Sequence, residues 1–65
     1  MPSELPARIS PDGRTATWNP ALTRAAQVSI EVRTPSGELV LRTTMNSGRA
    51  RVREPERIER ILCDD

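Results

Sequence analysis

Apolar and polar positions alternate most regularly in the middle of the chain, between Gln27 and Arg33. An alternation with a period of two residues is typical of a half-buried β-strand. Residues 38–45 and 49–53 show the same period. The sequence therefore predicts a three-stranded antiparallel meander. Its apolar sides are formed by Val28, Ile30 and Val32 in the first strand, by Leu39, Leu41 and Met45 in the second, and by Ala50 and Val52 in the third.

Three glycines punctuate the chain, and each closes a four-residue segment rich in turn-forming residues: 10–13, 34–37 and 45–48. Glycine accepts a positive φ at the last position of such a turn. The register of the hairpin around residues 34–37 has two solutions. Paired residue numbers that sum to 71 or 73 set Val32 against Leu39 or Leu41, whereas a three-residue loop with a glycine bulge gives 72 and sets Val32 against Val40. Both solutions stay open, since the apolar run 39–41 allows either face of that strand to be covered.

The N-terminal third predicts a short hairpin followed by a helical turn. Residues 7–10 and 15–18 flank the first turn and form the two strands of the hairpin. Asn19 and Pro20 then have the residue types of a helix N-cap and a first helical position, so a short mid-chain helix is expected. Residues 1–6 are expected to be a flexible tail.

The C-terminal segment predicts an amphipathic helix over residues 56–63. Pro55 has the residue type of a first helical position, and Ile58, Ile61 and Leu62 follow at the spacing of one helical stripe. We therefore expect an α+β fold: a small antiparallel meander of three strands, extended by the N-terminal hairpin, with a short mid-chain helix and a C-terminal amphipathic helix. Residues 7–65 are expected to form a single domain.

The run Trp18-Asn19-Pro20, followed by a strand and a Pro-Ser-Gly hairpin, resembles the front half of a fibronectin type III sandwich. That sandwich has seven strands, for which 65 residues are few, and the segment after Pro20 has a helical pattern. The resemblance therefore assigns no family to the chain.

Several kinds of chemistry are excluded by residue types that the sequence lacks. It has no His, no Lys and a single Cys, Cys63. Zinc, iron–sulfur and haem sites need clustered Cys and His ligands, and the common catalytic triads need a His base. A Schiff-base lysine and a phosphate-binding loop ending in Gly-Lys-Ser/Thr are equally absent. We expect a non-catalytic protein without cofactor or metal.

The composition also bears on the setting of the protein. No apolar stretch is long enough to cross a membrane, no signal peptide is visible, and one cysteine forms no internal disulfide, so we expect a cytoplasmic protein. Arginine in place of lysine suggests a GC-rich genome, as in many bacteria and phages.

The sequence offers few residues for a hydrophobic core. Thirteen Leu, Ile and Val residues make a thin core. A domain of this size is marginally stable alone, so a homo-oligomer or a complex is expected.

The predicted meander gathers five arginines on one sheet face, which we call the predicted stripe: Arg33, Arg42, Arg49, Arg51 and Arg53. Guanidinium groups are planar, bidentate donors for carboxylates and phosphates. Three interpretations stand beside each other: a solvated face whose charges are paired by Glu31, Glu38 and Glu54, a docking surface for an acidic protein, and a nucleic-acid surface. A net charge of +1 and a single aromatic residue count against nucleic acid.

The function expected from the sequence is that of a small regulatory or adaptor module that binds a larger protein. The contact surface is the predicted stripe or an exposed edge strand, with Trp18 as a core residue or a partner-binding anchor. The alternative is a nucleic-acid-binding regulator that uses the same arginines.

Overall fold

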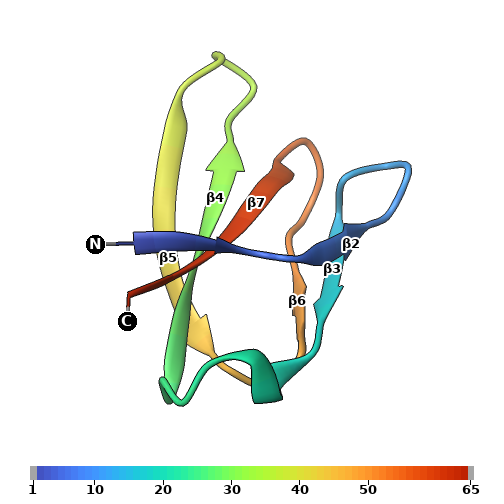
Figure 1. The fold of residues 1–65 in the computed structure, drawn as a ribbon. Coiled ribbons are helices and arrows are strands. Elements are labelled where there is room, and N and C mark those ends of the chain that lie inside the picture. The colour runs from blue at the N-terminus through green and yellow to red at the C-terminus, as the bar shows by residue number, and fades with distance from the viewer. Residues whose placement is uncertain (1, 65) are drawn as a thin grey trace.

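The computed structural model describes residues 2–64 and places seven strands in two antiparallel sheets (Figure 1). The larger sheet has the strand order β1-β7-β4-β5, and the smaller sheet has the order β2-β3-β6. The strands are β1 (Pro2–Leu5), β2 (Ala7–Ile9), β3 (Thr15–Trp18), β4 (Gln27–Arg33), β5 (Leu39–Met45), β6 (Arg49–Arg51) and β7 (Arg57–Asp64). One 3-10 turn, η1 (Pro20–Leu22), lies between β3 and β4.

The core lies between the two sheets, because each sheet turns one side of its alternating strands inward. The larger sheet contributes Leu5, Val28, Ile30, Val32, Ile58, Ile61 and Cys63, and the smaller sheet contributes Ala16, Trp18 and Ala50. Val52, just after β6, completes this set. The molecule is therefore a small β-sandwich.

The hairpin between β4 and β5 confirms the predicted strands and settles their register. Val32 pairs with Val40, so the paired residue numbers sum to 72. The backbone N–H of Thr34 donates to the Glu38 carbonyl at 2.9 Å, which leaves a three-residue loop whose Gly37 has a φ of +90°. Because of this register, the apolar side chains of Leu39, Leu41 and Met45 point to the outer face of the larger sheet.

The predicted C-terminal helix is wrong, since residues 57–64 form the strand β7 in the interior of the larger sheet. A bulge explains the misleading pattern. Arg60 pairs with Glu31 and Ile58 pairs with Val32, so Glu59 is an extra residue on β7. The extra residue brings Ile58 and Ile61, three positions apart, to the same buried side. A bulged strand therefore shows the spacing of a helical stripe.

The α+β fold class is wrong for the same reason: the residues that the structure describes form strands and one 3-10 turn, with no helix of seven or more residues. No helix within residues 2–64 is long and apolar enough to cross a membrane. The side chain of Asn19 caps η1 by accepting the N–H of Ala21 at 3.0 Å, so the predicted cap is present on a single turn.

The three-stranded meander is also corrected, because β6 pairs with β3 of the smaller sheet and not with β5. The turn at residues 46–48 redirects the chain. Trp18 donates its backbone N–H to the Gly48 carbonyl at 3.0 Å, which begins the pairing of β6 with β3. The predicted N-terminal hairpin is confirmed as β2 and β3, with Arg8 opposite Thr17.

Residues 2–5, which belong to the predicted flexible tail over residues 1–6, form the strand β1 along β7, and residue 1 lies outside the residues that the structure describes. Leu5 pairs with Ile61, and its side chain is buried in the core. The chain accommodates seven strands although its length predicted fewer. Four of the strands have only three or four residues each, so seven fit within residues 2–64.

Candidate functional site

The structure divides the predicted stripe between the two sheets. Arg33 lies on β4 and Arg42 on β5 in the larger sheet, whereas Arg49 and Arg51 lie on β6 in the smaller sheet. Arg53 follows β6. The five arginines therefore do not form one surface, because β5 and β6 belong to different sheets.

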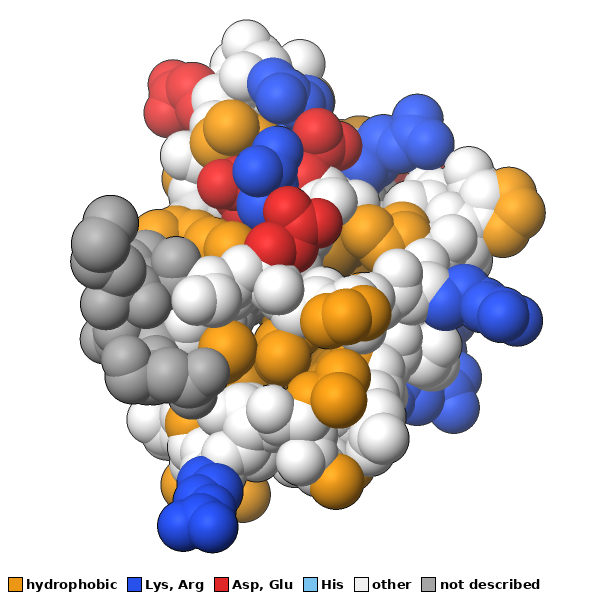
Figure 2. Space-filling view, viewed as in Figure 1, with side chains coloured by type: hydrophobic (Ala, Val, Ile, Leu, Met, Phe, Trp, Pro, Cys, Tyr) orange, Lys and Arg blue, Asp and Glu red, His pale blue; other side chains and the backbone are white. Residues whose placement is uncertain are grey.

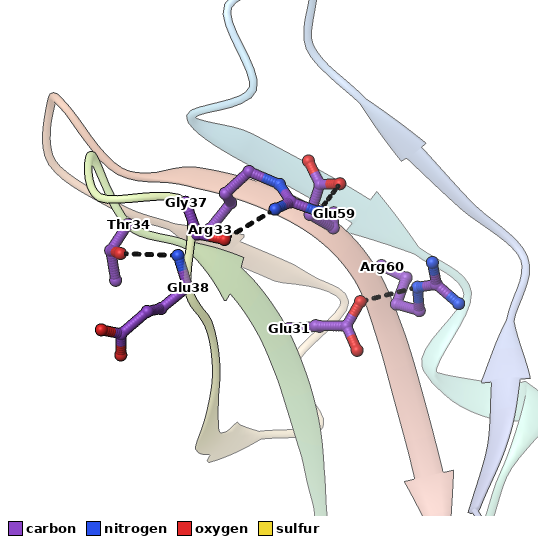
Figure 3. A network of polar contacts seen from close by, with 7 residues as sticks. All are labelled: Glu31, Arg33, Thr34, Gly37, Glu38, Glu59 and Arg60. Atoms are coloured by element: carbon purple, nitrogen blue, oxygen red, sulfur yellow. Dashed lines mark hydrogen bonds and ion pairs between the residues drawn. The ribbon is translucent and has the colours of Figure 1, made fainter.

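Three arginines of the larger sheet, Arg33, Arg42 and Arg60, are paired with glutamates, whereas Arg57 on β7 donates to the Pro11 carbonyl at 3.3 Å. The Arg33 guanidinium donates to the Gly37 carbonyl at 2.9 Å and lies 3.5 Å from the Glu59 carboxylate. Arg60 Nε lies 2.8 Å from Glu31 Oε1 (Figure 3). The solvated, charge-paired interpretation therefore fits this sheet, and Glu31 is one of the predicted partners.

Arg42 makes a two-pronged ion pair with Glu56, in the segment between β6 and β7. Its Nη1 donates to Glu56 Oε1 at 2.7 Å, and its Nη2 donates to Oε2. These hydrogen bonds lower the pKa of the Glu56 carboxyl and raise the pKa of Arg42. Because both guanidinium ends contact Glu56, this arginine is held near the edge of the larger sheet.

The outer side of the smaller sheet carries a second set of arginines, which we call the arginine face: Arg8, Arg49 and Arg51. Strand pairing places Arg8, Thr17 and Arg49 in one row across the three strands, and Thr15 and Arg51 in the next. The Cα atoms of Arg49 and Arg51 are about 6.8 Å apart along β6, given a rise of about 3.4 Å per residue. The Cα atoms of Arg8 and Arg49 are about 9.6 Å apart, which is two strand spacings. Three arginines and two threonines thus occupy neighbouring positions on the outer side of the smaller sheet.

Unlike Arg33, Arg42 and Arg60 of the larger sheet, the arginine face has no acidic partners among the residues that the structure describes. None of its three arginines forms an ion pair with any residue that the structure describes. Figure 2 shows one side of the molecule: acidic and basic side chains are mixed in the upper part of the view, and basic side chains at the right and at the lower left have no acidic neighbour in this view. A net charge of +1 therefore conceals an uneven distribution of positive charge.

The backbone of β6 is open along the edge away from β3, except that the Arg49 carbonyl accepts a hydrogen bond from the Ser47 hydroxyl at 3.2 Å. In an antiparallel pair, alternate residues direct their N–H and C=O groups to the partner strand. Gly48, Ala50 and Val52 do so toward β3, and Arg49 and Arg51 therefore direct theirs away from it. The bonds that set this alternation are Trp18 N to Gly48 O at 3.0 Å and Val52 N to Arg14 O at 2.8 Å.

A pocket of about 350 Å³ lies at the end of β6, and we call it the arginine pocket. It is lined by Arg14, Arg51, Val52 and Arg53. The Nε of Arg14 is buried from solvent and has no hydrogen-bond partner in the part of the chain that the structure describes. An unsatisfied buried donor is costly, so this N–H favours an anionic or polar oxygen beside it.

The turn before β3 holds Arg14 in position. Asp12 Oδ1 accepts hydrogen bonds from the Ser10 hydroxyl at 2.6 Å and from the Arg14 backbone N–H at 3.1 Å. The Ser10 bond is the main cause of the lowered pKa of Asp12, and the Arg14 bond adds to it. Asp12 therefore stays ionised and keeps the turn closed at neutral pH.

Trp18 is a core residue, with only 7% of its surface exposed. Its indole Nε1–H donates to Asn46 Oδ1 at 2.8 Å, so even its polar atom is used inside the fold. We therefore leave Trp18 out of the candidate binding surface.

Arg8 and Arg14 belong to the candidate site but not to the predicted stripe. The predicted N-terminal hairpin contained the signal for Arg8, because alternation places it on the side opposite to Ala7 and Ile9. No local pattern indicated that β6 lies beside β3, and that pairing is what brings Arg8 and Arg49 to one face.

The arginine face and the arginine pocket are suited to binding anions and not to holding a metal ion. Within residues 2–64, no three His, Cys, Asp or Glu side chains lie close enough to ligate a metal. Comparison of the chain with known protein families, with curated proteins and with solved structures finds no match to any of them.

Proposed function

We propose that this protein is a small, non-catalytic binding module that docks on a larger protein by taking an acidic, extended segment along β6. One observation carries the proposal. Arg49 and Arg51 have guanidiniums without an acidic partner among the residues that the structure describes, and their backbone N–H groups point to an open strand edge. A sheet edge of this kind accepts an added strand from a partner.

The geometry specifies the pattern of acidic residues in the partner. A strand that pairs with β6 places every second side chain on the same side as Arg49 and Arg51. Carboxylates at alternate positions therefore face the two guanidiniums. A further carboxylate at the end of the segment reaches the arginine pocket, which is lined by Arg14, Arg51 and Arg53. The partner is thus a segment with Glu or Asp at alternate positions.

The test is a binding titration with synthetic peptides at low salt. A peptide with glutamates at alternate positions is expected to bind, and a peptide of the same composition with its glutamates adjacent is expected to bind at least about tenfold more weakly. N-methylation of the glutamate backbone nitrogens removes the strand hydrogen bonds and leaves the charge unchanged. It is expected to abolish binding, because strand addition depends on the main chain.

The matching protein variants remove two positive charges at different places. Arg49→Ser with Arg51→Ser is expected to abolish peptide binding, whereas Arg24→Ser with Arg33→Ser has the same net charge and is expected to retain it. Failure of the alternating peptide to bind wild-type protein at low salt contradicts the proposal. Equal affinities of the two double variants do so as well.

The second candidate is a nucleic-acid-binding regulator, and the observation in its favour is the same set of arginines without acidic partners. Trp18, the one aromatic residue, is buried and provides no surface for base stacking, so the contacts would be to phosphates. Phosphate binding predicts that log affinity for duplex DNA falls with log salt at a slope of about −0.9 per phosphate contacted. Absence of duplex binding at low salt eliminates this candidate.

A further inference from the structure

The other open edge of interest is β5, which closes the larger sheet on the side away from β7. Its outer side presents three large apolar side chains to solvent: Leu39 is 48% exposed, Leu41 is 63% exposed and Met45 is 66% exposed. Edge strands in folded proteins are normally short, charged or covered. This edge has seven residues and is a surface that favours a further strand.

The hydrogen bonds of the hairpin show which backbone groups of β5 are available. Thr34 N donates to Glu38 O, and Asn46 N donates to Ala26 O, both at 2.9 Å. The even-numbered residues of β5 therefore bond to β4, by the alternation of antiparallel pairs. Leu39 and Leu41 direct their N–H and C=O groups to the open edge.

We propose that a second copy of this chain pairs with β5 in antiparallel orientation, with a two-fold axis at Val40. The segment Glu38-Leu39-Val40-Leu41-Arg42 is complementary to itself in this register. Glu38 of each copy lies opposite Arg42 of the other, and Leu39 lies opposite Leu41. Two opposite-charge pairs and two leucine pairs thus form at once, and both kinds of pair stabilise adjacent strands.

Hydrogen bonding restricts the competing registers. Only odd-numbered residues of β5 have open backbone groups, so two copies must pair odd residues with odd residues, which allows a two-fold axis at any residue of the strand. An axis at Arg42 sets two like charges directly opposite each other. An axis at Leu41 sets Arg42 against Val40, and an axis at Thr43 sets Arg42 against Thr44. Only the axis at Val40 sets Glu38 against Arg42.

The two charged side chains that this pairing needs, Glu38 and Arg42, are both able to reach the other copy. Glu38 is exposed, and its carboxylate has no ion pair within residues 2–64. Arg42 contacts Glu56 through Nη1 and Nη2, which leaves its Nε–H as a donor toward Glu38 of the other copy. Because β5 and β6 belong to different sheets, the dimer leaves the open edge of β6 uncovered in each copy. The proposal does not depend on the proposed function.

The first test measures mass against protein concentration by sedimentation velocity. Wild-type protein is expected to double its mass as the concentration rises from micromolar to millimolar. Leu41→Lys is expected to stay monomeric, since the lysines lie at the leucine pairs, while Leu22→Lys, at a side chain 51% exposed on η1, is expected to dimerise like wild type. A wild-type protein that remains monomeric throughout overturns the proposal, and so does dimerisation of Leu41→Lys at wild-type concentrations.

The second test exchanges the charges of the pair. Glu38→Arg and Arg42→Glu each set like charges opposite one another in a homodimer, so each alone is expected to dimerise at least about tenfold more weakly than wild type. In an equimolar mixture the introduced arginine faces the introduced glutamate, and Glu38 still faces Arg42, so a heterodimer is expected. Glu54→Arg changes the net charge as Glu38→Arg does and is the control for charge alone. A mixture that stays monomeric, or a control that also loses the dimer, contradicts this register.

Discussion

The indole nitrogen of Trp18 donates a hydrogen bond of 2.8 Å to the side-chain oxygen of Asn46, which lies between β5 and β6. The amide nitrogen of Asn46 donates in turn to the carbonyls of Pro20 and Ala25, both at 3.0 Å. One side chain therefore ties the core tryptophan to the connection between β3 and β4. This connection crosses from the smaller to the larger sheet, so Asn46 helps to hold the two sheets in place.

Replacing Asn46 is expected to destabilise the fold strongly. Asn46→Ala leaves the indole N–H and two carbonyls without their partner, and we expect a loss of about 2–3 kcal/mol, given about 1 kcal/mol per hydrogen bond. Asn46→Asp keeps an acceptor for Trp18 but removes the donor, and it is also expected to destabilise. Urea unfolding followed by the fluorescence of Trp18 measures both losses. Asn19→Ala removes one exposed cap and is expected to cost less; equal costs would refute the tying role of Asn46.

Two glycines with similar φ are expected to respond differently to alanine. Gly37 has a φ of +90° with open space around it, so Gly37→Ala costs only the left-handed conformation, about 1–2 kcal/mol. Gly48 has a φ of +88°, and an added Cβ would lie 3.1 Å from the Trp18 carbonyl oxygen and 3.2 Å from Pro20 Cδ. Gly48→Ala is therefore expected to lower the urea midpoint further than Gly37→Ala. The opposite order would show that the turn after β5 tolerates a side chain.

The ion pair between Arg42 and Glu56 is expected to contribute stability at neutral pH and to lose it in acid. Arg42 lowers the pKa of the folded-state carboxyl below its ordinary value of 4.5. The contribution is thus fully present above about pH 4.5 and is lost as the pH falls through the lower, folded-state value. Glu56→Gln lacks this contribution. The difference in urea midpoint between the two proteins should be largest at pH 7 and should shrink toward pH 3; a constant difference argues against the ionic contribution.

Shortening the side chain of Ile61 tests whether β7 packs in the core. Ile61 is 0% exposed and pairs with both Leu5 and Ile30, so Ile61→Val is expected to cost about 1 kcal/mol and Ile61→Ala about 2–5 kcal/mol. The matched surface change, Leu22→Ala, is expected to cost less than about 0.5 kcal/mol. Unfolding curves by circular dichroism measure all three. A loss of unfolding free energy in Leu22→Ala as large as that in Ile61→Ala would contradict the packing of Ile61 in the core.

Local patterns predicted the elements whose partners are close in sequence. The alternation along Gln27–Arg33 and the loop around Gly37 predicted the hairpin of β4 and β5, and the segments around the first turn predicted β2 and β3. In both hairpins the turn residues bring together strands that are neighbours in the chain. Such pairings depend on a few consecutive residues, which is why the sequence alone was sufficient for them.

The candidate site was predicted only in part, because its members come from distant segments. Arg49, Arg51 and Arg53 were identified, but Arg8 and Arg14 enter the site only because β6 pairs with β3. Arg33 and Arg42 leave it because they pair with Glu59 on β7 and with Glu56 in the segment just before β7. Which charges are neutralised depends on contacts between residues far apart in the chain, and no local pattern contains that information.

The sequence by itself determined the strand character of the middle of the chain, the glycine turns and the absence of the residue types that most catalytic chemistry needs. The tertiary structure decided which strand β6 joins, and it decided that residues 57–64 form a bulged strand. The physical reason is the same in both cases. Residues 56–63 can bury Ile58 and Ile61 as a helix or as a bulged strand, and the choice falls to the strand because β1 and β4 pair with it on either side.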